Sequence, residues 1–102
     1  MGKYVFAYKG GTMADTPEAQ EAAMNAWMGW FGELGAAVVD GGNPFAGSTA
    51  VLADGSVGTA GAGLTGYSVV EAATLDVAAS LAKGCPVLAA GGSVEVYEAL
   101  PM

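Results

Sequence analysis

Alternating residue types near the start of the chain predict a β-strand. Residues 3–8 read Lys-Tyr-Val-Phe-Ala-Tyr, and a pair of glycines follows shortly after. Successive side chains of a strand point to opposite faces. Tyr4, Phe6 and Tyr8 therefore share one face, and two small aliphatic side chains share the other. Neither face is polar, so we expect both to be covered.

Residues 15–34 carry the start and stop signals of a long helix. The segment Asp15-Thr16-Pro17-Glu18 supplies a capping residue, a proline near the first helical position and acids in the first turn. Gly35 then provides a stop signal. The second half of the helix is rich in large apolar side chains, which predicts burial on more than one side.

The aromatic cluster of this helix has two readings. Trp27, Phe31 and Leu34 recur at helical spacing, so we expect them to point one way and pack onto the sheet. Trp30 lies off that stripe and is the better candidate for a groove or an interface. Alternatively, the whole cluster lines a small-molecule pocket.

The rest of the chain predicts further strands and a second helix. Residues 56–65 contain little but Gly, Ala, Ser and Thr, which favours a flexible loop. The strands are expected at residues 37–40, 49–53, 66–71 and 93–98, and the helix from Thr74 to Gly84.

The resulting order is β-α-β-β-β-α-β, and merging the middle strands gives the two βαβ halves of a ferredoxin-like fold. We therefore predict an α+β, two-layer sandwich formed by one domain, residues 1–102. Both helices would cover one face of the antiparallel sheet. The other face is expected to meet a second copy, which makes the protein a homodimer.

Composition excludes several partners. The chain of 102 residues has ten acidic residues against three lysines, a net charge of −7 and no histidine. An acidic surface does not bind nucleic acid. The longest apolar stretches are broken before the roughly 18 residues that a membrane span needs, so we expect a soluble, cytoplasmic protein. The single cysteine, Cys85, fits a reducing compartment and predicts a buried, inert thiol.

No cofactor or metal is expected. Gly61-x-Gly63-x-x-Gly66 matches a dinucleotide-binding fingerprint in its letters, but its third glycine is expected to open a strand rather than a helix. Without histidine and with one cysteine, only carboxylates such as Glu95 and Glu98 remain as metal ligands, and these read as a solvated face.

The segment Asp40-Gly-Gly-Asn43-Pro-Phe45 is the most distinctive in the chain. In one reading Asp and Asn only cap the backbone of a turn. In the other, Asp40 is the candidate catalytic residue, acting as a base or an orienting group, and Asn43 donates a hydrogen bond to a ligand. The candidate ligand-binding residues are Asp40, Asn43, Phe45, Trp30, Tyr8 and Tyr67.

The chain resembles the YCII-related (DGPF-domain) family over nearly its whole length. The similarity rests on the order and spacing of the opening strand, Trp27-x-x-Trp30-Phe31, Asp40-Gly-Gly-Asn-Pro-Phe45 and Gly84-Cys85-Pro86, the last being typical of one subgroup. The resemblance implies a ferredoxin-like dimeric α/β barrel, in which two sheets face each other and enclose a cleft near residues 40–45.

The chain departs from the family at its suggested chemistry. A few relatives are lyase-like enzymes that act on chlorinated aromatics, with a helix histidine and a nearby acid as the suggested catalytic pair. Met24 stands at or near the position of that histidine, and the Asp-Gly-Pro-Phe signature is replaced by Asp54-Gly55-Ser56-Val57.

Three functions therefore remain open. The leading hypothesis is a homodimer that binds a small aromatic or carboxylic molecule without histidine-based catalysis. The alternative is a lyase- or isomerase-like enzyme that uses Asp40 as a base and a tyrosine as an acid or hydrogen-bond donor. The third is a purely structural dimer with a packed interface.

Overall fold

The strand predicted at the start of the chain lies inside a four-stranded antiparallel sheet. The computed structural model describes residues 1–11 and 14–102. β1 pairs with β5 on one side and with β6 on the other, and β2 pairs with the far edge of β5, giving the order β2-β5-β1-β6. The sheet is formed by β1 (Gly2–Lys9), β2 (Val38–Asp40), β5 (Leu64–Ala72) and β6 (Ser93–Ala99).

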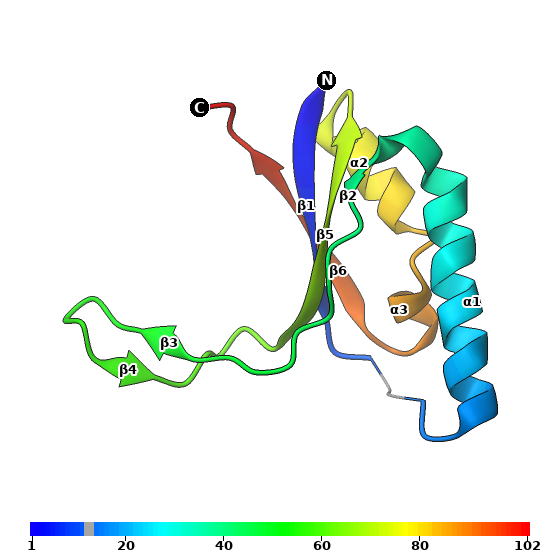
Figure 1. The fold of residues 1–102 in the computed structure, drawn as a ribbon. Coiled ribbons are helices and arrows are strands. Elements are labelled where there is room, and N and C mark those ends of the chain that lie inside the picture. The colour runs from blue at the N-terminus through cyan, green and yellow to red at the C-terminus, as the bar shows by residue number, and fades with distance from the viewer. Residues whose placement is uncertain (12–13) are drawn as a thin grey trace.

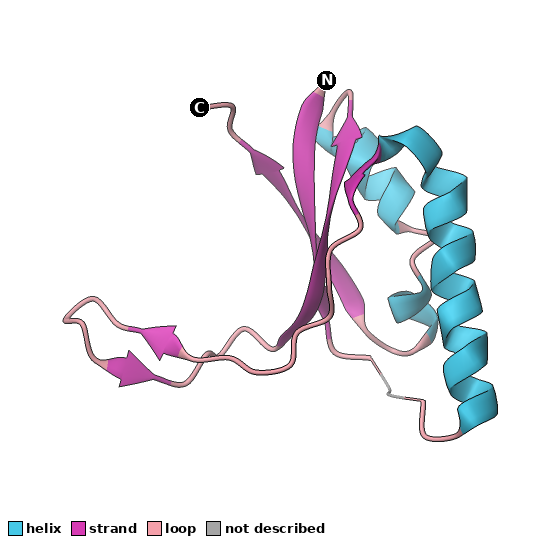
Figure 2. Cartoon of the chain, in the orientation of Figure 1, coloured by secondary structure: helices cyan, strands magenta, loops and turns pink. Residues whose placement is uncertain are grey.

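All the described helices lie on one side of this sheet (Figures 1 and 2). Local sequence signals fix their ends. The Thr16 hydroxyl accepts a hydrogen bond from the Ala19 N–H at 3.1 Å and so caps α1. Thr74 caps α2 in the same way. The helices are α1 (Pro17–Leu34), the 3₁₀ turn η1 (Gly35–Ala37), α2 (Leu75–Ala82) and α3 (Pro86–Ala89). The expected α+β class is confirmed.

The middle of the chain differs from the prediction. The strand expected at residues 49–53 does not join the sheet, because β3 (Ala50–Val51) pairs only with β4 (Val57–Gly58) in a separate hairpin. β4 lies within residues 56–65, which were expected to be a loop. The helix α3 and the turn η1 were not predicted, since a four-residue or three-residue element is too short to show a hydrophobic period.

The core lies between the sheet and the helices. The aromatic face of β1 points into it, and Phe6 is fully buried. Phe6 stacks against Trp30, with ring centroids 6.0 Å apart. Buried core side chains are contributed by β1, β5, α1, α2 and the segment around α3: Tyr4, Phe6, Tyr8, Trp30, Val70, Ala72, Ala78, Ala82, Cys85 and Val87.

The expectation that Trp30 faces a groove is wrong. Trp30 is 4% exposed, and its indole N–H donates to the Leu81 carbonyl at 3.2 Å. The apolar stripe of a helix in a globular protein is at least about 100° wide. Trp30 follows Trp27 by three positions and Phe31 follows it by four, so both belong to the same stripe. Gly84 leaves room for the ring, because a Cβ there would lie 3.2 Å from Trp30.

Candidate functional site

The segment that follows β2 continues along β5 instead of leaving the sheet. The Phe45 N–H donates to the Thr65 carbonyl at 2.9 Å, and the Tyr67 N–H donates to the Asn43 carbonyl at 3.3 Å. Gly42 makes this close approach possible. Its φ is +72°, and a Cβ there would overlap with the carbonyl oxygen of Tyr67. We call residues 41–45 the cleft loop.

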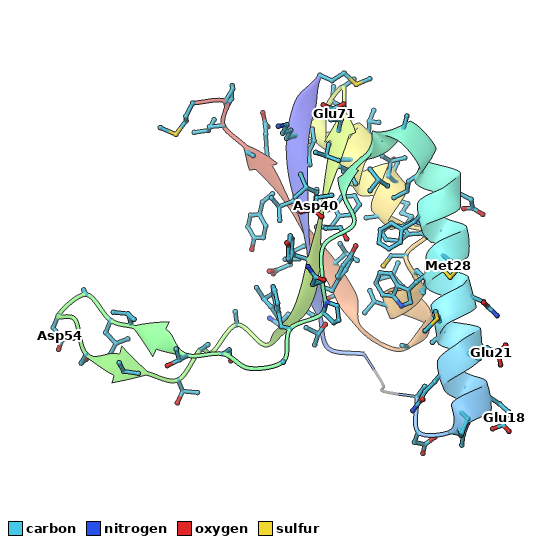
Figure 3. All side chains as sticks on the ribbon, viewed as in Figure 1. Glu18, Glu21, Met28, Asp40, Asp54 and Glu71 are labelled. Atoms are coloured by element: carbon cyan, nitrogen blue, oxygen red, sulfur yellow. The ribbon has the colours of Figure 1, made fainter. Side chains whose placement is uncertain are left out.

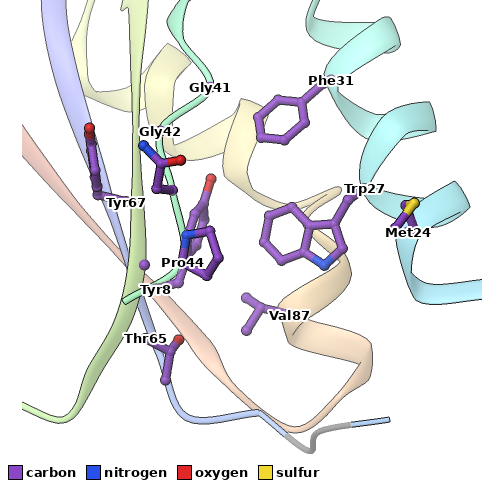
Figure 4. A pocket seen from close by; sticks show the side chains of 12 residues that line it. Tyr8, Met24, Trp27, Phe31, Gly41, Gly42, Pro44, Thr65, Tyr67 and Val87 are labelled. Atoms are coloured by element: carbon purple, nitrogen blue, oxygen red, sulfur yellow. The ribbon is translucent and has the colours of Figure 1, made fainter. Parts of the chain in front are cut away.

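A cleft of about 460 Å³ lies between the cleft loop and the helices (Figure 4). Trp27 and Phe31 of α1 form one wall, and Val87 of α3 borders the same space. The opposite wall is formed by Pro44, and by Tyr8 of β1. Its described lining residues are Tyr8, Met24, Trp27, Phe31, Gly41, Gly42, Asn43, Pro44, Thr65, Gly66, Tyr67 and Val87.

A short chain of hydrogen bonds joins the core to the cleft loop. The Tyr8 hydroxyl donates to Ser68 Oγ at 2.7 Å, and the Ser68 hydroxyl donates to the Gly41 carbonyl at 2.6 Å. Ser68 is fully buried. Burial raises the pKa of Tyr8 to about 12, an effect that its hydrogen bond with Ser68 partly offsets. Tyr8 is therefore a neutral hydrogen-bond donor at physiological pH, and its proton is already engaged.

The cleft is apolar and aromatic. The rings of Tyr8 and Trp27 meet edge to face, with centroids 5.0 Å apart, and Trp27 and Phe31 lie 6.0 Å apart. The indole N–H of Trp27 makes no hydrogen bond with another described residue. None of the described lining residues carries a charge. The cleft can therefore hold a flat apolar group beside a small number of neutral polar atoms.

The structure separates the residues predicted from sequence into two groups. Tyr8, Asn43 and Tyr67 border the cleft, although the ring of Tyr67 stacks on Phe45, with centroids 5.8 Å apart. Neighbours of Tyr67 in β5 face the core, so its ring and Phe45 lie on the sheet face away from the helices. Phe45 does not line the cleft, and neither does the core residue Trp30.

Asp40 caps the backbone of a turn, which is one of the two roles considered for it from the sequence. Its Oδ1 accepts a hydrogen bond from the Gly42 N–H at 2.9 Å, so the carboxylate stabilises the start of the cleft loop. Asp40 is exposed, and it is not among the residues that line the cleft.

Sequence reasoning missed most of the helical side of the cleft. Met24 of α1 and Val87 of α3 were not candidates, nor was Thr65 of β5 on the strand side, and Trp27 and Phe31 were expected mainly to fill the core. They do both, because they pack against the core cluster while bordering the cleft. The useful signal was the aromatic cluster of α1 as a whole.

Other candidate chemistry is limited. Cys85 is 3% exposed, and burial raises the pKa of its thiol to about 11, so it is not an activated nucleophile. Within residues 1–11 and 14–102, no group of three or more His, Cys, Asp or Glu side chains is arranged to hold a metal ion. Among the described helices, none has the length and apolar character needed to cross a membrane.

A scan against protein-family models and searches of curated proteins and of solved structures each found no match to this chain. This cleft is a different feature from the cleft between two subunits that the family resemblance implies. The cleft described above is formed within one chain, between sheet and helices, whereas the resemblance implies a cleft enclosed by two facing sheets.

Proposed function

We propose that this protein binds a small molecule in the cleft between α1 and the cleft loop, and that it acts as a homodimer without histidine-based catalysis. The observation that carries the proposal is the cleft itself, whose volume of about 460 Å³ falls within the roughly 300–1,000 Å³ of small-molecule sites. Such sites combine aromatic walls with a few polar groups, which is the composition found here.

The lining favours a neutral aromatic ligand over a carboxylic one. A carboxylate in an apolar cleft needs a cationic or strongly donating partner to replace its water. No lysine is among the described lining residues, and the protein as a whole has a net charge of −7, which repels anions. A planar ring with one hydroxyl or amide group fits better, since the indole N–H of Trp27 makes no hydrogen bond with another described residue.

The strand order supports a ferredoxin-like assignment. Without the separate β3–β4 hairpin, the chain reads as two βαβ halves, and the order β2-β5-β1-β6 interleaves them as a split βαβ fold does. The sheet face without helices would then lie in a dimer interface, as in a dimeric α/β barrel of the YCII-related kind. This part of the proposal rests on the sheet order and on the family resemblance.

Met24 explains why histidine chemistry is not part of the proposal. It lines the cleft at or near the position where the resemblance would place a catalytic histidine. A thioether does not transfer protons, so Met24 cannot supply the chemistry that the resemblance assigns to a histidine there. The enzymatic alternative has less support, because Asp40 points into the turn of the cleft loop and does not line the cleft.

The test is a pair of ligands matched in shape and different in charge. The melting temperature of the protein is measured with 2-naphthol and with 2-naphthoate at increasing concentration. A ligand at 100 times its Kd adds about 2.7 kcal/mol to the stability of the folded state. We expect 2-naphthol to raise the melting temperature and 2-naphthoate to have little effect.

Two methionines of α1 provide the variant and its control. Met24 is 64% exposed and Met28 is 63% exposed, but only Met24 lines the cleft. Met24→Glu places a charge at the apolar cleft and should weaken naphthol binding about tenfold or more, whereas Met28→Glu should leave the affinity unchanged. Equal effects of the two variants, or no stabilisation by any neutral aromatic compound, would contradict the proposal.

A further inference from the structure

The chain exposes more surface than a compact monomer of its size. A globular protein of 10.0 kDa is expected to expose about 5,200 Å². This chain exposes 6767 Å², a surplus of roughly 1,500 Å² over that expectation. Its radius of gyration is 14.9 Å, against about 13 Å for a compact domain of this length. The single chain is therefore more extended, and exposes more surface, than a compact domain of its size.

Much of the extra surface belongs to one segment. Residues 46–63, which we call the arm, carry the β3–β4 hairpin away from the sheet on the side opposite the helices (Figure 1). Asp54 marks its tip in Figure 3. Val51 and Val57 pair across the hairpin and so share a face, yet they are 72% and 74% exposed. Most of the surface of this valine pair is therefore open to solvent.

The arm also lacks the features that protect an exposed hairpin. Free strand edges are usually blunted by lysine, proline or a run of charges. Asp54 is the only charged residue of the arm, and the arm contains no lysine and no proline. A two-stranded hairpin alone is marginally stable in water. A hairpin with a single charge and an exposed valine pair, extending away from its own core, is best explained by packing on another surface.

The sheet presents a suitable surface on the same side of the molecule. Its face away from the helices, which we call the open face, has an apolar row across three strands formed by Val69, Val5 and Tyr97. Tyr97 is 55% exposed. The stacked rings of Phe45 and Tyr67 extend this apolar area towards the base of the arm. Figure 2 shows no described helix over this face.

We propose that the arm of each copy packs against the open face of a second copy in a two-fold dimer. The inference deepens the proposed function and rests on the homodimer that it includes. The surplus of roughly 1,500 Å² per copy exceeds the approximately 800 Å² per partner of a stable interface. Two copies with a net charge of −7 repel each other, so a nearly uncharged arm suits the contact. In a two-fold dimer each arm covers the open face of the other copy. Both apolar surfaces are then buried, and no further copy can add.

Sedimentation equilibrium tests the proposal with two lysine substitutions. Val57→Lys places a charge on the arm. Met28→Lys makes the same type of change at an exposed position of α1, a helix on the opposite side of the sheet from the arm (Figure 1). Each dimer would bury two lysines in the first variant and none in the second. We expect Val57→Lys to raise the dimer Kd by about 100-fold or more, and Met28→Lys to change it less than about threefold.

The outcomes separate this inference from the proposed function. If the wild-type protein is a dimer and the two variants have the same dimer Kd as each other, the role of the arm is overturned. The homodimer itself is not. A wild-type protein that remains monomeric at 100 times the concentrations used for the cleft assay overturns the homodimer and the arm contact together. Naphthol binding by such a monomer would leave the cleft proposal intact.

Hydrogen exchange of the wild-type protein provides a second measurement that needs no variant. Backbone amides of β3 and β4 should be protected at concentrations where the dimer forms and should lose that protection on dilution. Protection that does not depend on concentration would mean that the arm folds back on its own open face, and it would overturn the exchange. Absence of protection at every concentration would overturn it as well.

Discussion

Replacing Ser68 by alanine removes the hydroxyl that connects the core to the cleft loop. In the wild-type protein this group accepts from Tyr8 at 2.7 Å and donates to the Gly41 carbonyl at 2.6 Å. Without it, the Tyr8 hydroxyl is a donor with no acceptor, on a side chain that is only 5% exposed. Leaving a buried polar group unpaired costs about 1–3 kcal/mol. The Gly41 carbonyl belongs to an exposed residue and can bond to water instead.

We therefore expect Ser68→Ala to lower the free energy of unfolding by about 2–3 kcal/mol, a large part of the 5–15 kcal/mol of a typical domain. Tyr8→Phe should cost less, about 1 kcal/mol, because Ser68 keeps its bond to Gly41. The double variant leaves no buried tyrosine hydroxyl without an acceptor. Its loss of unfolding free energy should therefore be about 1 kcal/mol smaller than the sum of the two single losses.

Urea unfolding at one fixed protein concentration measures all four free energies and keeps any contribution of dimerisation constant. Additive losses would show that Tyr8 and Ser68 are not energetically coupled. A loss below about 0.5 kcal/mol for Ser68→Ala would refute the reasoning, since it would mean that the Tyr8 hydroxyl finds water or another acceptor at once.

Three further predictions concern the loop backbone and two titrating groups. Gly42→Ala should cost about 3 kcal/mol in urea unfolding, against about 1 kcal/mol for Gly91→Ala. Both glycines have a positive φ, but a Cβ at Gly42 would overlap with the Tyr67 carbonyl, whereas a Cβ at Gly91 would meet no atom within 4 Å. Equal losses of unfolding free energy in the two variants would contradict this prediction. Because burial raises the pKa of Tyr8 to about 12, the unfolded chain releases this proton first as pH rises. The stability contributed by Tyr8 should therefore be complete below about pH 10 and be lost between about pH 10 and 12, and Tyr8→Phe should reduce that alkaline loss. Because burial raises the pKa of Cys85 to about 11, iodoacetamide at neutral pH should label the native thiol at least tenfold more slowly than the urea-unfolded thiol, and equal rates would argue against its burial.

Local sequence signals predicted the regular elements well because those elements depend on near neighbours. Thr16 and Gly35 fixed the ends of α1, and alternation in β1 identified which side chains enter the core. The cleft loop depends on a distant partner, since residues 43 and 45 bond to residues 67 and 65 of β5. Nothing in the loop sequence itself indicates that Gly42 approaches a carbonyl on another strand.

The site was predicted less well for a related reason. The residue types of a cleft resemble those of a core, and Trp27 differs from Trp30 only by a rotation about the helix axis. That rotation decides which indole meets α2 and which meets the cleft loop, and it is set by tertiary packing. Asp40 attracted attention as a rare charge, yet its carboxylate serves the turn. In an uncharged cleft, this charged residue was a poor guide to the walls, whereas Asn43 does border the cleft.

The two tryptophans provide the most direct test of the cleft as a ligand site. The chain has two indole N–H groups, so a nitrogen-edited proton spectrum contains two indole signals. Trp30 donates to the Leu81 carbonyl inside the core and serves as an internal control, whereas Trp27 borders the cleft. Titration with 2-naphthol should move the Trp27 signal in a saturable manner and leave the Trp30 signal nearly unchanged. If neither signal moves at millimolar 2-naphthol or with other neutral aromatic compounds, the cleft is not a site for such ligands.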